Sequence, residues 1–231
     1  MSEIIRQIDM GKSNAYLIET EKGYILVDSG MPDKVEKIER VLSEKNADLK
    51  DILLIIITHV HYDHVGSLAA LKGKSGAEVL VHEKEKEFLE KGRTDFPAGT
   101  VIISKLISKL SNLISESKFK ALSPDITIED HYDLKEYGID GEVIHTPGHT
   151  RGSISVIINR EDIICGDTLF NFMPHSVYPP FANDKKQLIE SWKKIKNYNC
   201  QRFYPGHGSI FSQKKFIKTL NKKLLYNLKR E

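Results

Sequence analysis

A run of six apolar residues ends directly at a cluster of histidine and aspartate side chains. Residues 52–57 read Ile-Leu-Leu-Ile-Ile-Ile, and residues 58–64 read Thr-His-Val-His-Tyr-Asp-His. An unbroken run of isoleucine and leucine is typical of a strand that is buried on both faces. The chain is therefore expected to place its densest group of polar side chains at the end of a central, buried strand.

The rest of the sequence alternates between strand-like and helix-like segments. Strands are predicted at residues 15–19, 24–27, 52–57, 78–82, 126–128, 142–145, 153–158, 162–165 and around Phe203. Helices are predicted at residues 32–42, 65–71, 83–91, 184–196 and 214–230. Two strand-rich halves joined by helices indicate an α/β protein with two packed sheets and helices outside. The length of 231 residues fits a single domain over residues 1–231.

Residues 92–124 depart from this alternation. The segment begins with Gly92, Pro97 and Gly99, and continues with apolar residues at helical spacing between positions 101 and 114. We interpret it as a helical insertion in the main framework. It is expected to form either a lid over the functional site or a contact in a homodimer.

Composition limits the partners and the compartment. Hydrophobic residues make up 40% of the chain, the net charge is +2, and no apolar run is long enough to span a bilayer. No secretory signal is visible, and two cysteines are too few for a disulfide framework. These observations predict a cytoplasmic protein with reduced thiols and no membrane partner.

The lysine-rich segment at residues 214–230 raises the question of a nucleic-acid patch. Apolar residues recur at helical spacing between the lysines, at positions 216, 217, 220, 224, 225 and 228. The lysines are therefore interpreted as the solvated face of a docked helix. No nucleic-acid partner is expected.

Four side chains that can bind a metal fall within residues 59–64: His59, His61, Asp63 and His64. Imidazole and carboxylate groups are ligands that zinc accepts. An extended backbone points His59 and His61 to the same side, whereas Asp63 and His64 lie at the entrance to a helix. The spacing offers one pair of ligands to each of two metals. The alternative is a solvated turn in which Asp63 caps the helix.

Three later motifs each add one candidate ligand after a predicted strand. They are Thr-Pro-Gly-His-Thr at 146–150, Cys-Gly-Asp-Thr at 165–168 and Tyr-Pro-Gly-His-Gly at 204–208. Each places its histidine or aspartate beside a glycine, which allows the backbone to approach closely. A framework of strands that presents polar residues from its ends is the expected way to build a site.

Together these motifs resemble those of the metallo-β-lactamase superfamily, whose hallmark is a His-x-His-x-Asp-His loop followed by a later His, Asp and His. The resemblance covers about residues 14–208 and implies a four-layer αβ/βα sandwich with two mixed sheets. It also implies a ligand set in which one metal is held by His59, His61 and His149, a second by Asp63, His64 and His207, and both by a bridging Asp167. Two divalent ions are expected, zinc first, with iron or manganese as alternatives.

The resemblance and the ligand chemistry imply a hydrolase. Two metal ions lower the pKa of bound water towards 7, so that a bridging hydroxide would attack a carbonyl or phosphoryl centre. Asp63 would orient this nucleophile, and Asp167 would keep the two ions close together. These two carboxylates are the expected catalytic residues.

Residues outside the ligand set receive supporting roles. Asp28 ends a predicted strand and is expected to orient a ligand histidine; a simple turn carboxylate is the alternative. An aromatic-rich segment after Asp167 is expected to line an apolar substrate pocket, with core packing as the alternative. Its members are Phe170, Phe172, His175, Tyr178 and Phe181. Tyr178 and His175 are candidates for protonating a leaving group.

The substrate is predicted only by class. Asp167 at the bridging position argues against a true β-lactamase, and the segment after Phe170 lacks the basic residues that glyoxalase II uses for glutathione. A small ester, thioester or lactone is therefore the expected small-molecule substrate. The alternatives are a mononuclear iron persulfide dioxygenase, a phosphodiesterase or nuclease of the same superfamily, and a non-catalytic metal-binding module.

Overall fold

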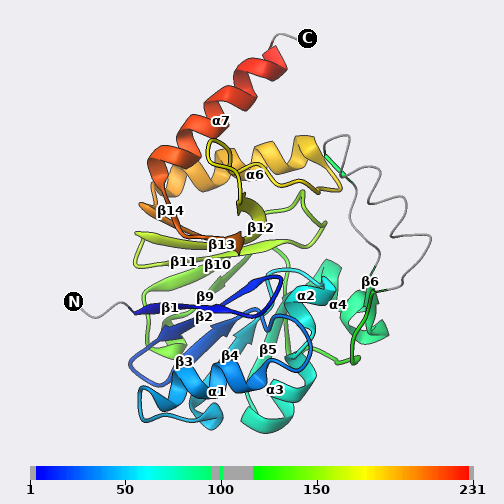
Figure 1. Ribbon diagram of the computed structural model, residues 1–231, viewed down its shortest axis with the longest axis vertical. Coiled ribbons are helices and arrows are strands. Elements are labelled where there is room, and N and C mark those ends of the chain that lie inside the picture. The colour runs from blue at the N-terminus through cyan, green and yellow to red at the C-terminus, as the bar shows by residue number, and fades with distance from the viewer. Residues whose placement is uncertain (1–3, 95–98, 101–116, 229–231) are drawn as a thin grey trace.

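Two six-stranded sheets face each other in a computed structural model that describes residues 4–94, 99–100 and 117–228 (Figure 1). The order of the first sheet is β1-β2-β3-β4-β5-β8, and its last three pairings are parallel. Its strands are β1 (Ile5–Asp9), β2 (Asn14–Glu19), β3 (Tyr24–Val27), β4 (Ile52–Ile56), β5 (Glu78–His82) and β8 (Ile126–Ile128). The sheet is therefore mixed, with the predicted buried strand β4 inside it.

The order of the second sheet is β14-β13-β12-β11-β10-β9, and only the β12–β13 pairing is parallel. Its strands are β9 (His131–Asp133), β10 (Gly141–His145), β11 (Ile154–Ile158), β12 (Asp162–Asn171), β13 (Arg202–Gly208) and β14 (Phe211–Ser212). The helices are α1 (Val35–Ser43), α2 (Tyr62–Val65), α3 (Leu68–Ser75), α4 (Glu83–Lys91), α6 (Lys185–Tyr198) and α7 (Gln213–Leu228), with 3-10 turns at Leu49–Asp51 and Lys135–Tyr137.

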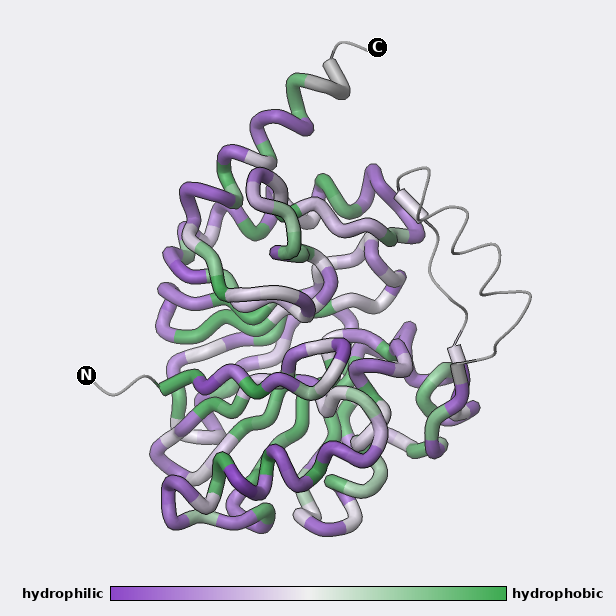
Figure 2. Tube along the Cα trace, viewed as in Figure 1, coloured by the Kyte–Doolittle hydropathy of each residue, from purple (hydrophilic) through white to green (hydrophobic). Residues whose placement is uncertain are grey.

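Three apolar cores separate four layers, as Figures 1 and 2 show. One core lies between the first sheet and α1, α3 and α4; the second lies between the sheets; the third lies between the second sheet and α6 and α7. Strand β4 contributes to two of them, because Leu54 and Ile56 pack between the sheets, whereas Ile55 and the residue that follows the strand, Ile57, pack under the helices. The prediction of a strand buried on both faces, and of an α/β sandwich with helices outside, is confirmed.

Two predicted strand ends in the second sheet were wrong. Strand β12 continues past Cys165 to Asn171, with register shifts against β13 on both sides of Gly166. Strand β13 likewise includes the whole Pro-Gly-His segment at 205–207. The predicted strands ended too early because the residue pattern of an irregular strand resembles that of a strand end, although pairing resumes beyond each bulge.

The predicted helix at residues 65–71 is divided into α2 and α3. The break lies at Gly66 and Ser67, where Gly66 donates its N–H to Gly30 O at 2.8 Å and Ser67 Oγ donates to Met31 O at 2.6 Å. These bonds to a distant segment replace the continuing helical ladder. The helix predicted from residue 32 begins at Val35 for a related reason, since Lys34 N donates to Ser67 Oγ at 3.0 Å.

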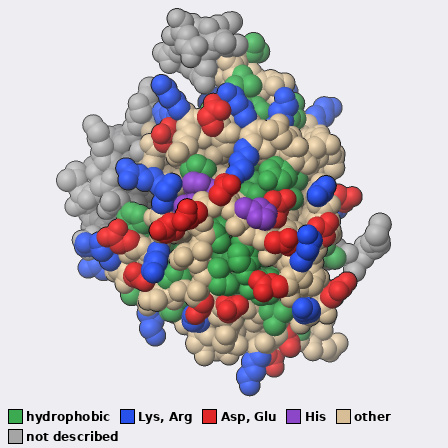
Figure 3. Space-filling model, turned by 180° about the vertical axis from the view of Figure 1, so that it is seen from behind, with side chains coloured by type: hydrophobic (Ala, Val, Ile, Leu, Met, Phe, Trp, Pro, Cys, Tyr) green, Lys and Arg blue, Asp and Glu red, His purple; other side chains and the backbone are tan. Residues whose placement is uncertain are grey.

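Most of the predicted insertion at 92–124 lies outside the described residues, so its amphipathic helix, its lid role and its dimer role stay predictions. Its two flanks are described: β6 (Arg93–Thr94) pairs antiparallel with β7 (Ser117–Lys118). Over the part of the chain that the structure describes, no helix has both the length and the apolar composition to cross a bilayer. Charged side chains of both signs are interspersed on the face drawn in Figure 3.

Candidate metal centre

The segment after β4 carries two buried histidines that meet at their ring nitrogens. His59 Nε2 lies 2.9 Å from His61 Nδ1, and both side chains are buried. Backbone hydrogen bonding holds the start of this segment at the interface between the sheets, because Ile154 N donates to Thr58 O at 2.9 Å. The predicted placement of these two histidines on the same side is what the structure shows.

His149 and Asp167 complete a first group of four. His149 Nε2 lies 3.1 Å from His61 Nδ1, and Asp167 Oδ2 lies 3.4 Å from His149 Nε2 and 3.7 Å from His59 Nε2. The candidate ligand atoms of these four residues lie within 4.8 Å of one another. Two nitrogen ligands on a tetrahedral zinc ion stand about 3.4 Å apart. The spacing of this group therefore fits a metal ion.

Asp63, His64 and His207 form a second group. His207 Nε2 lies 3.4 Å from both His64 Nε2 and Asp63 Oδ2. Asp63 is the most accessible of these side chains, with 24% of its surface exposed against 10% for His207. The second group is therefore the one that opens towards solvent.

Asp167 stands between the two groups. Its Oδ1 lies 3.3 Å from His64 Nε2, and its Oδ2 lies 3.2 Å from His207 Nε2, in addition to its contacts with the first group. Oδ1 is buried and receives no hydrogen bond from any residue that the structure describes. An unsatisfied buried carboxylate oxygen is costly. A cation between the groups would satisfy it, so the donor set fits two metal ions that share Asp167.

The protonation tendencies of the first group suit a metal. Burial holds the pKa of His59, His61 and His149 below the ordinary value, so these imidazoles are neutral and their lone pairs are free. Burial alone would raise the pKa of Asp167, but His207 and His64 outweigh it and lower that pKa well below the usual range. Three neutral imidazoles beside an ionised carboxylate are the forms that bind a divalent cation.

In the second group the pKa values of the histidines are shifted in the opposite direction when no metal is bound. Burial lowers the pKa of His64, but the charges of Asp167 and Asp28 outweigh burial and raise it. The pKa of His207 is raised as well, since Asp167 outweighs burial there too. Binding of a cation at this group would therefore release protons.

Outer partners orient four of the five ring systems. His64 Nδ1 faces Asp28 Oδ2 at 2.8 Å, so the predicted role of Asp28 has a defined target. The Nδ1 atoms of His59, His149 and His207 face Thr58 Oγ1 at 3.1 Å, Phe181 O at 3.0 Å and Lys12 O at 2.7 Å. These contacts turn each Nε2 towards the centre. His61 differs, because its Nδ1 is the atom that faces the other ligands.

One supporting carboxylate was missed in the sequence. Glu85 of α4 is buried; its Oε2 accepts the N–H of Val60 at 2.8 Å and its Oε1 accepts the N–H of Gly152 at 3.0 Å. It therefore ties the loop of His59 and His61 to the loop of His149. The sequence does contain one indication of this role. Glu85 precedes Phe88 by three residues and Leu89 by four, so it lies on the face of the helix that is expected to be apolar.

The turn before β2 and the start of that strand were also missed. Tyr16 Oη donates to Pro205 O at 2.6 Å, and Asn14 Nδ2 donates to Gly208 O at 2.8 Å. Ser13 Oγ donates to Asp63 O. These three bonds join the first sheet to both halves of the second group, and they depend on contacts across as many as 194 residues.

Gly206 shows why a glycine lies beside a ligand. A Cβ atom at this position would stand 2.2 Å from Asp167 Oδ1 and 2.8 Å from His64 Cε1. Any larger residue would therefore push apart the groups that meet at Asp167. The expectation that glycine permits close backbone approach holds here in atomic terms.

The aromatic candidates separate into two sets. The Phe170 ring stacks on His207 with centroids 4.6 Å apart, and Phe172, 60% exposed, lies 5.7 Å from the same ring. Phe181 contributes its carbonyl to His149. Tyr178 packs edge-on against Trp192, with Lys223 Nζ over its ring. His175 lines a pocket beside α7. Only the first set contacts the ligands, and the proton-donor roles of Tyr178 and His175 stay predictions.

Comparison with known proteins agrees with this geometry. A profile of the metallo-beta-lactamase superfamily matches residues 8–207. A probable metallo-hydrolase of Methanocaldococcus jannaschii is 35% identical over 86% of this chain and 88% of its own. A hydroxyacylglutathione hydrolase of Pelagibacter ubique is 27% identical over 86% of this chain and 71% of its own. A crystal structure of an archaeal metallo-beta-lactamase superfamily protein from Sulfolobus tokodaii, 24% identical, matches 97% of this chain and 87% of its own with a TM-score of 0.68.

Proposed function

The chain belongs to the metallo-β-lactamase superfamily and is a metal-dependent hydrolase. On this premise we propose that it uses two divalent metal ions, with zinc as the expected metal, to cleave a small ester, thioester or lactone. The observation that carries the proposal is the position of Asp167. Its two carboxylate oxygens contact histidines of both groups, and Oδ1 receives no hydrogen bond from the described residues, although His64 Nε2 lies 3.3 Å away. That arrangement suits a carboxylate shared by two cations.

The metal ions and the residues around them would have distinct roles. When bound, the two ions would lower the pKa of water and polarise the carbonyl oxygen of the substrate. His59, His61 and His149 would hold one ion, and Asp63, His64 and His207 the other, with Asp167 shared. Asp63, the most accessible member, would orient the water and accept its proton. Asp28, Thr58 and the carbonyls of Lys12 and Phe181 keep the imidazoles in the ligand orientation.

The surroundings of His207 support an acyl substrate. Phe170 and Phe172 form an apolar wall beside this ring, and apolar walls with few polar groups are typical of small-molecule sites. One relative is named for the hydrolysis of a hydroxyacylglutathione, which favours an acyl group over a phosphodiester. The two remaining candidates, a mononuclear iron persulfide dioxygenase and a phosphodiesterase or nuclease, are outcomes of the test.

The test combines metal analysis with a substrate screen. Purified protein should contain two zinc ions per chain and should hydrolyse members of an ester, thioester and lactone panel. Asp167→Ala should lose at least about 100-fold in kcat/KM, the scale on which a site-organising electrostatic group acts. The exposed Asp133→Ala is the matched control and should keep full activity. One iron and no zinc per chain would favour the dioxygenase, cleavage of a phosphodiester alone would favour the phosphodiesterase, and full activity in Asp167→Ala would refute the proposed roles.

A further inference from the structure

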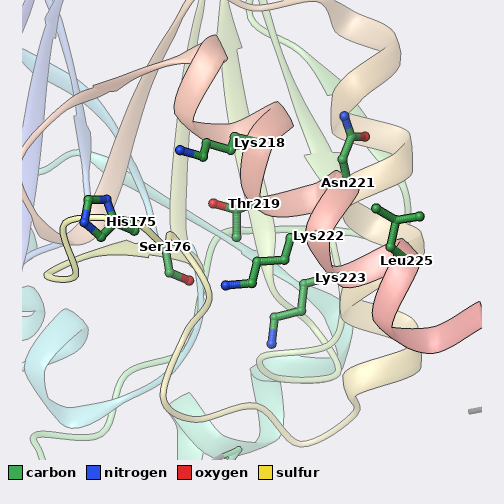
Figure 4. A pocket seen from close by; sticks show the side chains of 8 residues that line it. All are labelled: His175, Ser176, Lys218, Thr219, Asn221, Lys222, Lys223 and Leu225. Atoms are coloured by element: carbon green, nitrogen blue, oxygen red, sulfur yellow. The ribbon is translucent and has the colours of Figure 1, made fainter. Parts of the chain in front are cut away.

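A second concave site lies between α7 and the loop after β12 (Figure 4). It has a volume of about 680 Å³ and includes His175 and Ser176 from the loop. Across from them, α7 contributes Lys218, Lys222 and Lys223. In Figure 4 the lysine side chains leave α7 and extend into the space beside that loop. A pocket with three ammonium groups on one wall has a chemical preference that the metal centre does not explain.

The lysines in this pocket have no counter-charge among the described residues. Within the described residues, no carboxylate lies at ion-pair distance from Lys218, Lys222 or Lys223. Lys223 is half-buried, and its Nζ stands 3.4 Å from the centroid of the Tyr178 ring. Burial lowers the pKa of Lys223, and the charges of Lys185 and Lys222 lower it further. Like charges in a cleft with low-dielectric walls raise the local concentration of anions.

We propose that this pocket binds a carboxylate or phosphate group of the same molecule whose acyl bond is cleaved at the metal centre. The proposal rests on the proposed hydrolase function for its substrate. Anion binding at the pocket, in contrast, is inferred from the three lysines and does not depend on the hydrolase function. Ammonium groups act as point charges that pair with either kind of anion, so the two sources are separated by experiment.

The structure connects the pocket to the metal centre through the first turns of α7. Lys215 Nζ donates to Met173 O at 2.9 Å and to Asn171 Oδ1. Asn171 pairs with Gly208, the neighbour of His207. A rise of about 1.5 Å per helical residue puts Lys222 about 10 Å along α7 from Lys215. The preferred substrate is therefore elongated, with its anionic group on the order of 10 Å beyond the point where α7 meets β12 and β13.

The kinetic test uses three esters with the same acyl group. Their alcohol portions end in a carboxylate, a phosphate or a neutral amide, and the length of the alcohol portion is varied from about 10 Å upwards. Lys222→Gln/Lys223→Gln should raise KM for the two anionic esters about tenfold and leave kcat, and both constants for the neutral ester, unchanged. Lys214→Gln is the matched control, because Lys214 is exposed on α7 outside the pocket. A larger effect on one anionic ester identifies the source, and equal effects on all three esters would overturn the proposal.

A binding test decides the site even when no ester is cleaved. Trp192 is the single tryptophan, and its ring contacts Tyr178, over which Lys223 stands. Titration of the metal-loaded chain with inorganic phosphate should change its fluorescence, with an affinity that falls several-fold in the double variant but not in Lys214→Gln. Identical titrations in all three proteins would refute the pocket. If the unaltered protein hydrolyses none of the esters but still binds phosphate in a lysine-dependent way, only the proposed function is refuted. Lys218→Gln, a change at an exposed position, repeats the test with little risk to folding.

Discussion

The carboxylate of Asp28 joins the end of β3 to the ring of His64. Its Oδ2 lies 2.8 Å from His64 Nδ1, and its Oδ1 accepts the N–H of Thr58 at 2.8 Å. Asp28 has a φ of 61°, a left-handed conformation that aspartate tolerates better than most residues. In this conformation the buried Asp28 carboxylate accepts a hydrogen bond from the Nδ1 proton of His64, which leaves Nε2 of the same ring to face a cation.

Asp28→Asn should weaken metal binding without unfolding the chain. Asparagine also tolerates positive φ, but it replaces the charge that favours the Nδ1–H form of His64. Zinc affinity, measured by competition with a chromogenic chelator, should fall about 10- to 100-fold. Asp33→Asn is the matched control, because Asp33 is exposed and has a φ of 59°. Unchanged zinc affinity in Asp28→Asn would show that Asp28 is only a turn residue.

Gly206→Ala should separate the two metal groups. The added methyl would stand 2.2 Å from Asp167 Oδ1, so the carboxylate must move away from His64. Elemental analysis should show fewer than two metal ions per chain. Gly73→Ala is the control: a Cβ there meets nothing within 4 Å, and alanine should stabilise α3 by about 0.5–1 kcal/mol. Two bound ions in Gly206→Ala would contradict a shared Asp167.

Glu85→Gln should loosen the contact between the two ligand loops. Glutamine has one acceptor oxygen, so the N–H of Val60 or of Gly152 loses its partner in a buried place. The free energy of unfolding of metal-free protein should fall by about 1–3 kcal/mol, as measured by urea denaturation. Zinc affinity should fall with it. The exposed Glu83→Gln in the same helix should change neither quantity, and an equal effect there would assign the loss to helix charge.

His82 should make stability depend on pH through the N-terminal cap of α4. Its Nδ1 accepts the N–H of Lys84 at 3.0 Å, so its Nε2 carries the proton that faces Glu129 O at 2.8 Å. Burial, assisted by His145, lowers the pKa of His82 to about 4. A folded-state pKa below the unfolded value of about 6.5 stabilises the fold above pH 6.5, and this stabilisation is lost as pH falls towards 4.

His82→Asn keeps a capping oxygen but removes the titration. Between pH 6.5 and 4.5 the free energy of unfolding of this variant should therefore fall less steeply than that of the unaltered chain. Urea denaturation of metal-free protein across this range measures the difference, and the titrations of the histidines that do not contact His82 cancel in it. Exposed His131→Asn should follow the unaltered chain. Parallel profiles for His82→Asn would remove His82 from the pH response.

Local sequence determined the elements and half of the candidate centre. The unbroken apolar run of β4 required cover on both faces, and the spacing of His59 and His61 placed both rings on one side of an extended segment. Asp63 and His64 follow within the same loop, so their proximity needed no distant contact. These features depend on neighbours a few residues apart, which is the range over which residue pattern controls backbone geometry.

Tertiary structure alone decided how the halves meet. Asp167 and His207 lie inside irregular strands whose pairing resumes beyond each glycine, and a residue pattern does not record such bulges. Glu85, Tyr16 and the lysines of α7 acquired their roles from partners on other elements. The bond from Asn14 to Gly208 spans 194 residues, and only the packing of one sheet on the other brings those groups together. The chain thus specified its metal-binding side chains locally, and the fold decided their arrangement because that arrangement is a set of contacts between distant segments.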